Sequence, residues 1–237
     1  MGRPSRRLPV EAPAAALTGY KLAQLLLAVD GSAVAFAGLS VGGSRVYRAV
    51  DEAVCVYSRR HSPPDRRGDC GFYCVHTAEA ARGLAADTTY RGGVLLEVAA
   101  SGRFIRYEDG LRYQRQRVLA VRVGLCGCGR RAEGFVDAEG GLVGWRRLLP
   151  VCDGCAGHKP QVPPARIGAL LPGIPVTADD GVRPLDEAPG PWEGAGDAKV
   201  ALLSAEVSLL QARLDVVQSR LASLEGAEYR PRNGTTD

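Results

Sequence analysis

Leu-Cys-Gly-Cys-Gly-Arg at residues 125–130 and Val-Cys-Asp-Gly-Cys at residues 151–155 are the most informative stretches of this chain. Together they supply two close cysteine pairs: Cys126, Cys128, Cys152 and Cys155. Structural zinc takes four thiolate or imidazole ligands in a tetrahedron, and short chains usually supply them from two such knuckles. The gap between the pairs suits a short β-hairpin. We therefore expect a zinc-ribbon-like segment at residues 124–159, the alternative being thiols that bind nothing.

A second group of cysteine and histidine residues lies upstream of the first. Its members are Cys55, His61, Cys70, Cys74 and His76. Cys55, His61 and Cys70 are the strongest candidates for a second tetrahedral zinc site, with Cys74, or else His76, as the fourth ligand. On a fully extended strand Cys70 and Cys74 would lie roughly 13 Å apart, so this site needs a bend at Gly71. The alternative is a buried Cys55, a surface His61 and a free Cys74. The chain is thus expected to bind one or two structural zinc ions.

The residues around this second group resemble a set of small actinobacterial proteins. Their shared pattern is His-x-x-Pro followed by Cys-x-Cys-Gly-x-Tyr, and the resemblance covers about residues 45–123. His61 and Pro64 match the first half, and Cys-Gly-Phe-Tyr at residues 70–73 matches the second. Gly68 stands where those proteins have the first cysteine of the pair. The resemblance implies no particular reaction.

The remainder of residues 16–123 is expected to form a β-rich domain. Two apolar runs flank Asp30-Gly31, a dipeptide favoured in hairpin turns, and we favour a hairpin there over a helix. Residues 94–99, 103–107 and 113–123 indicate a three-segment meander, with Ser101-Gly102 as its first turn. Residues 77–86 indicate a short helix capped by Thr77.

The two ends of the chain have different patterns. Residues 1–15 are expected to be a disordered tail, the proline-rich residues 160–197 a semi-extended linker, and residues 227–237 a loose tail. Residues 198–226 carry four heptads of apolar positions and predict a coiled coil rather than a helix packed against the domain. These positions are Val200, Leu203, Val207, Leu210, Leu214, Val217, Leu221 and Leu224. The fold expected overall is mainly β, a zinc-stabilised meander plus ribbon with a C-terminal coiled-coil helix.

Composition narrows the classes of protein that the chain can belong to. The net charge is +4, but only three residues are lysine, so the arginine excess fits a high-GC bacterial genome as well as phosphate binding. No signal-peptide-like run or uninterrupted apolar span of about 20 residues occurs, so we expect a soluble, cytoplasmic protein without membrane contact. A phosphate-binding loop, a nucleophile elbow and a zinc-protease helix are all missing, so we do not expect an enzyme.

Two functions remain from the sequence. The first is a non-enzymatic zinc-binding scaffold or adaptor that self-associates through the coiled coil and recruits protein partners. The alternative is a zinc-ribbon factor that binds DNA or RNA. Five arginines interleaved with aromatic residues over residues 103–117 favour that alternative. Nearby acidic residues oppose it.

Overall fold

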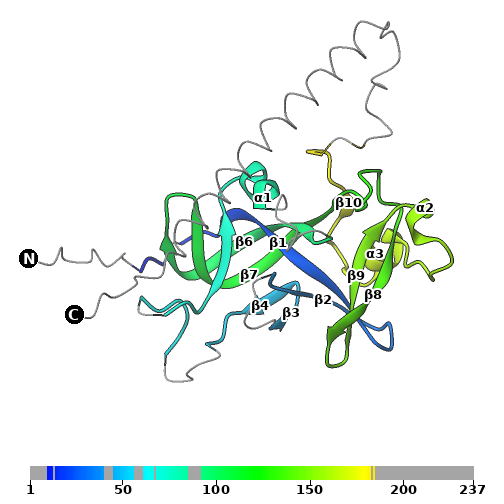
Figure 1. Cartoon of the computed structure of the whole chain (residues 1–237). Coiled ribbons are helices and arrows are strands. Elements are labelled where there is room, and N and C mark those ends of the chain that lie inside the picture. Colours follow the sequence, from blue (N-terminus) through cyan, green and yellow to red (C-terminus); the bar gives the residue numbers. More distant parts are fainter. Residues whose placement is uncertain are drawn as a thin grey trace, which may run out of the picture. The chain divides into compact units, whose positions relative to one another are not determined.

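The described part of the chain is mainly β. The computed structural model describes residues 10–12, 14–39, 45–55, 61–66, 68–84, 92–182 and 184. The elements are, in chain order, β1 (Leu17–Ala28), β2 (Val34–Ala37), β3 (Val46–Tyr47), β4 (Val50–Glu52), β5 (Phe72–Val75), α1 (Ala78–Leu84), β6 (Val94–Arg106), β7 (Gly110–Val123), β8 (Gly134–Leu142), β9 (Trp145–Val151), α2 (Asp153–Ala156), α3 (Pro164–Ala169) and β10 (Val176–Ala178). All described residues belong to one compact unit (Figure 1).

Strand β1 joins the two parts of the sheet. Its first half, residues 17–23, pairs with β6, and its second half pairs with β9 over residues 25–28. It also pairs with β2 across the turn at Asp30-Gly31, where Gly31 adopts a φ of 70°. The hairpin prediction is confirmed, and the consecutive residues Leu25–Leu27 are all buried, so both faces of this part of β1 are covered.

Strand β7 organises the rest of the sheet. One of its edges is taken by β6 along almost the whole strand. Three short strands share the other edge in succession: β5 at residues 110–113, β4 at residues 115–117 and β10 at residues 121–123. Because β5 also pairs with β1, at Tyr20 and Val75, the pairings close into a ring of strands around the core. Its largest fully buried side chains include Tyr113, Phe36 and Phe135.

The expected meander differs from the structure at its first turn. The segments predicted at residues 94–99 and 103–107 are a single strand, β6, interrupted by a bulge between Ser101 and Phe104. Gly102 sits in this bulge with a φ of 74°. A glycine with positive φ occurs in bulges as well as in turns. Ser101-Gly102 therefore does interrupt the regular strand, as predicted, but the predicted reversal of the chain at this point is wrong.

The predicted linker at residues 160–197 is wrong over its first half. Residues 164–169 form α3, and β10 pairs in parallel with β7. Ile167 and Leu171 are buried in the main hydrophobic core. Pro164 stands at the start of α3, where a missing N–H costs nothing. These apolar side chains anchor the segment in spite of its prolines.

The remaining expectations about the chain are settled in part. The capped helix is confirmed as α1, where the Ala80 N–H donates to the Thr77 hydroxyl at 3.1 Å. The tail predicted at residues 1–15 is too long, because Glu11 pairs with Phe104 through two backbone hydrogen bonds.

The predicted coiled coil lies outside the described residues. Among the helices that are described, none is long and apolar enough to cross a membrane.

Candidate metal centres

The first cysteine group sits at the open end of the β8–β9 hairpin. The pair at 126 and 128 lies in the loop just before β8, where the Cys126 N–H donates to the Arg130 carbonyl at 2.9 Å. Cys152 directly follows β9 and begins α2, so that its carbonyl accepts the N–H groups of Cys155 and Ala156. The antiparallel pairing of the hairpin therefore brings two knuckles, 24 positions apart at Cys128 and Cys152, to one place.

The four sulfur atoms of this first cluster are arranged as a tetrahedral site requires. All of them lie within 4.8 Å of one another, and the Cys128 and Cys152 sulfurs are 3.6 Å apart. Zinc–sulfur bonds of about 2.3 Å in a tetrahedron place sulfurs roughly 3.8 Å apart, whereas a disulfide would bring two of them to about 2.05 Å. The cluster could therefore hold a metal ion, and its donor set suits zinc or iron.

The surroundings of the first cluster favour a thiolate at Cys126, whereas hydrogen bonds with the other three thiols raise the pKa of Cys155 to about 12. Burial alone would raise the pKa of Cys126, but hydrogen bonds from the N–H groups of Cys128 and Cys152 and from neighbouring thiols lower it to about 7. The thiolate is the form that ligates metal. Cys126 and Cys152 are buried while Cys128 and Cys155 are exposed, so one side of the cluster reaches solvent.

The second cluster lies beside the edge of β7 with which both β4 and β5 pair. The pairing of β4 ends at Glu52–Arg115, and the pairing of β5 begins at Phe72–Tyr113, two positions away on β7. Residues 53–71 therefore form an excursion whose two ends are adjacent. Cys55 and Cys70 stand at these two ends, and His61 lies within the loop between them. Their ligand atoms all lie within 4.8 Å of one another, so this group too could hold a metal ion.

His61 in the second cluster is oriented in the way that a metal ligand usually is. Its Nε2 lies 3.2 Å from the Cys70 sulfur, while its Nδ1 faces the Asp65 carboxylate at 3.7 Å. Ligating histidines commonly direct their second nitrogen to a carboxylate, which fixes the ring and its tautomer. Asp65 was not predicted from the sequence, although its position four residues after His61 indicates this pairing.

Cys74 is not part of the second cluster, contrary to the prediction. It lies on the extended strand β5 opposite Leu111, it is buried, and its sulfur packs against Gly19. Burial raises the pKa of its thiol to about 11, despite the nearby Lys21 ammonium. The other candidate, His76, is exposed beyond the end of β5. The bend that Gly71 was expected to supply does not turn Cys74 back toward Cys70.

The second cluster therefore offers three cysteine or histidine side chains that could ligate a metal ion. All seven cysteines and all three histidines of the chain lie among the described residues, and none beyond Cys55, His61 and Cys70 joins this group. A zinc ion bound here would take its fourth ligand from a carboxylate, from water or from another molecule.

Arg112 is a second residue that the sequence did not single out for this site. It is buried on β7, and it donates to the carbonyls of Asp65, at 2.8 Å, and of Gly68. These two bonds attach the excursion to the sheet from inside. The role that the sequence suggested for Arg112, contact with a polymer, is excluded by this burial.

Comparisons of the whole chain with protein-family models, with curated proteins and with solved structures found no match.

Proposed function

We propose that this protein is a zinc-stabilised adaptor that self-associates through residues 198–226 and presents its β unit to protein partners. The observation that carries the zinc part is the convergence of four cysteine sulfurs at the base of the β8–β9 hairpin. Four thiolates complete a tetrahedral shell and leave no position for a substrate, which favours a structural role over a catalytic one.

Zinc at the two clusters would close two long loops of the β unit. At the first it joins the segment before β8 to the start of α2, and at the second it joins the two ends of the 53–71 excursion. Because such sites are not preformed in the unfolded chain, metal binding contributes to folding, with apparent free energies of about 10–16 kcal/mol in zinc-finger peptides.

Metal analysis tests the zinc assignment directly. The reduced full-length protein should contain two zinc ions per chain by mass spectrometry of the elements. Cys126→Ser and Cys70→Ser should each lose one ion, whereas Cys74→Ser, which changes a cysteine outside both clusters, should lose none. Iron in place of zinc, or an equal loss from Cys74→Ser, would contradict the assignment.

Self-association rests on the heptads and is tested in the full chain. Lysine at the apolar position 214 should reduce the mass in light scattering to that of a monomer, because a charge in the seam of a coiled coil opposes association. Ala212→Lys, on the outer face of the predicted helix, is the matched control. An oligomer that survives Leu214→Lys would refute the coiled-coil part of the proposal.

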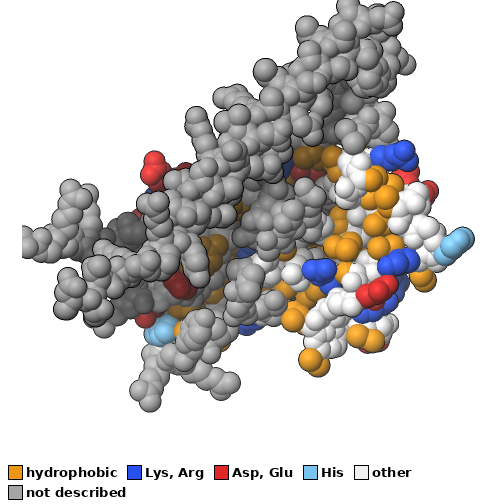
Figure 2. Space-filling view, in the orientation of Figure 1, with side chains coloured by type: hydrophobic (Ala, Val, Ile, Leu, Met, Phe, Trp, Pro, Cys, Tyr) orange, Lys and Arg blue, Asp and Glu red, His pale blue; other side chains and the backbone are white. Residues whose placement is uncertain are grey.

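The alternative of single-stranded nucleic acid binding is less well supported. It requires aromatic rings on the sheet surface, but of the three rings in this region Phe104 and Tyr113 are almost fully buried and Tyr107 alone is exposed, at 38%. Two of the exposed arginines of this region, Arg106 and Arg115, lie near the carboxylates of Glu11 and Glu52. Over the described residues on the face shown in Figure 2, basic side chains are scattered among apolar and neutral ones. Retention on heparin that falls with added salt would revive this alternative.

A further inference from the structure

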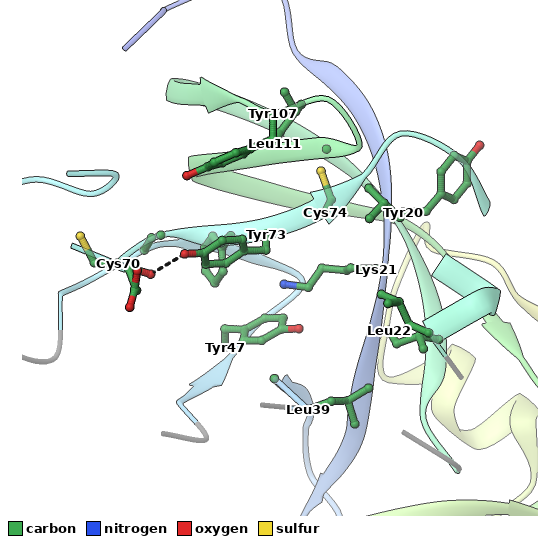
Figure 3. Close-up of a pocket in the computed structure, with 18 of the residues that line it drawn as sticks. Tyr20, Lys21, Leu22, Leu39, Tyr47, Cys70, Tyr73, Cys74, Tyr107 and Leu111 are labelled. Carbon is green, nitrogen blue, oxygen red and sulfur yellow. Dashed lines mark hydrogen bonds between the residues drawn. The ribbon is translucent and has the colours of Figure 1, made fainter. Parts of the chain in front are cut away.

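A cavity of about 810 Å³ opens beside the second cluster, between β1, β3 and β5 (Figure 3). Its lining is mostly apolar and aromatic, and includes Leu22, Leu39, Tyr47, Phe72 and Leu111. Pockets of about 300–1,000 Å³ with apolar walls and a few polar groups are typical of small-molecule sites. We call it the Lys21 cavity, after the lysine in its wall.

The amino group of Lys21 projects from β1 into the Lys21 cavity. Its Nζ lies 4.7 Å from the centre of the Tyr47 ring and 5.1 Å from that of Phe72. Figure 3 shows the side chain extending between Tyr47 and Tyr73. Asp69 and Asp109 also line the cavity, but neither forms an ion pair with Lys21 within the described part of the chain. The ammonium therefore faces aromatic rings, and the described residues supply no counter-ion to it.

Two further polar groups of the cavity wall have no hydrogen-bond partner among the residues that the structure describes. These are the buried hydroxyl of Tyr47 and the buried Nη1 of Arg45. Buried polar atoms in folded proteins nearly always have a partner, so each unpaired one calls for an explanation. The Nη2 of Arg45 lies 3.7 Å from the Asp51 carboxylate, so Lys21 supplies the positive charge that has no carboxylate partner among the described residues. The Nη1 of Arg45 and the hydroxyl of Tyr47 add two hydrogen-bond donors, and an ammonium with two such donors suits an oxyanion.

We propose that the Lys21 cavity binds a small apolar molecule with a single carboxylate, which pairs with the Lys21 ammonium. The aromatic and leucine side chains would enclose the apolar body, while Arg45 and Tyr47 donate further hydrogen bonds to the carboxylate. Cys70 of the second cluster also lines this cavity, but the contacts to the carboxylate come from other residues, and the proposal goes beyond the adaptor function. Burial lowers the pKa of Lys21 to about 8, so the ligand should bind best below pH 8, where the amine is charged.

A pair of ligands that differ only in charge tests the proposal. Equilibrium dialysis of the full-length, zinc-loaded protein at pH 7 should show decanoate binding at least about tenfold more tightly than decanol, or about 1.4 kcal/mol. Above pH 8 the decanoate affinity should fall by up to about tenfold per pH unit while that for decanol stays constant. No measurable binding of either ligand, or equal affinity for the two, would overturn the proposal.

Variants separate the role of the charge from that of the fold. Lys21→Met should abolish the preference for decanoate yet retain decanol, and Lys21→Arg should keep the preference. Leu39→Trp, which places bulk in the wall, should weaken both ligands. Lys159→Met, at an exposed lysine paired with Glu139, is the control and should bind as the wild type does. A decanoate preference that persists in Lys21→Met would refute the role of Lys21.

Discussion

Replacing Lys21 by methionine is expected to stabilise the ligand-free protein. The pKa of Lys21 falls from 10.5 to about 8 because burial removes water from its ammonium. At 1.36 kcal/mol per pKa unit, this change corresponds to about 3 kcal/mol against the charged form in the folded protein. Cation–π attraction to the rings of Tyr47 and Phe72 offsets about 0.5–1 kcal/mol of this cost per ring. The net cost of the charge at neutral pH is therefore about 1–2 kcal/mol.

The pH dependence distinguishes this explanation from a change in packing. Between pH 8 and pH 10.5 the unfolded chain binds more protons at Lys21 than the folded protein does, so the wild type gains stability as pH rises through this window. Lys21→Met lacks this titration. Its free energy of unfolding should exceed that of the wild type by about 1–2 kcal/mol at pH 7, and this difference should shrink steadily above pH 8.

Urea unfolding, followed by circular dichroism from pH 7 to pH 10, measures the difference. Lys159→Met is the matched control, because an exposed pair such as Lys159 and Glu139 contributes little, about 0–1 kcal/mol. A Lys21→Met protein that is less stable than the wild type at pH 7, by an amount independent of pH, would show that the charge of Lys21 carries no such cost.

Three further changes test other parts of the structure. Ile167→Ala should lower the free energy of unfolding by about 2–5 kcal/mol in urea, because it empties a fully buried position; no change would mean that the α3 segment is not docked. Asp179→Asn tests the bonds of 2.9 and 2.6 Å from Arg82. Burial alone would raise the pKa of Asp179, but these bonds hold it below 3.8. The free energy of unfolding of the wild type should therefore fall as pH drops below about 4. The variant should lack this pH-dependent contribution of about 1.5–3 kcal/mol. Gly68→Cys restores at the second cluster the Cys-x-Cys spacing of the first, in a place where an added Cβ meets nothing within 4 Å. In competition with a chromophoric chelator it should tighten one zinc ion by about tenfold or more, about 1.4 kcal/mol; unchanged affinity would place Gly68 away from the fourth position.

Local patterns predicted the hairpins and the first cluster. The turn at Asp30-Gly31 and the knuckles around Cys126 and Cys152 depend on residues close in sequence, and the structure has each of them where the pattern placed it. The prediction failed where partners are distant. Nothing near Cys74 reveals that β5 pairs with β7 and keeps the strand straight beyond Cys70.

The docking of the segment after Pro160 was not predicted, because the segment is rich in proline. Its prolines argued for a linker, but Ile167, Leu170, Leu171 and Ile174 follow the spacing of one helical face, and that period was visible in the sequence. The Lys21 cavity had no comparable signal. A lysine within an apolar strand resembles any edge residue until β3 and β5 place Tyr47 and Phe72 over it.

The division of β1 between two sets of partners has a consequence for how this protein can vary. The ribbon strand β9 pairs with residues 25–28 of a strand whose other half belongs to the β5–β7 ring. Cutting the chain between residues 123 and 124 would remove the pairing between β9 and Leu25–Leu27, leaving one edge of each strand open while β2 still pairs with β1 and β8 with β9. The ribbon is therefore not a cassette that gene fusion can move intact into another protein, and the two halves should be inherited together.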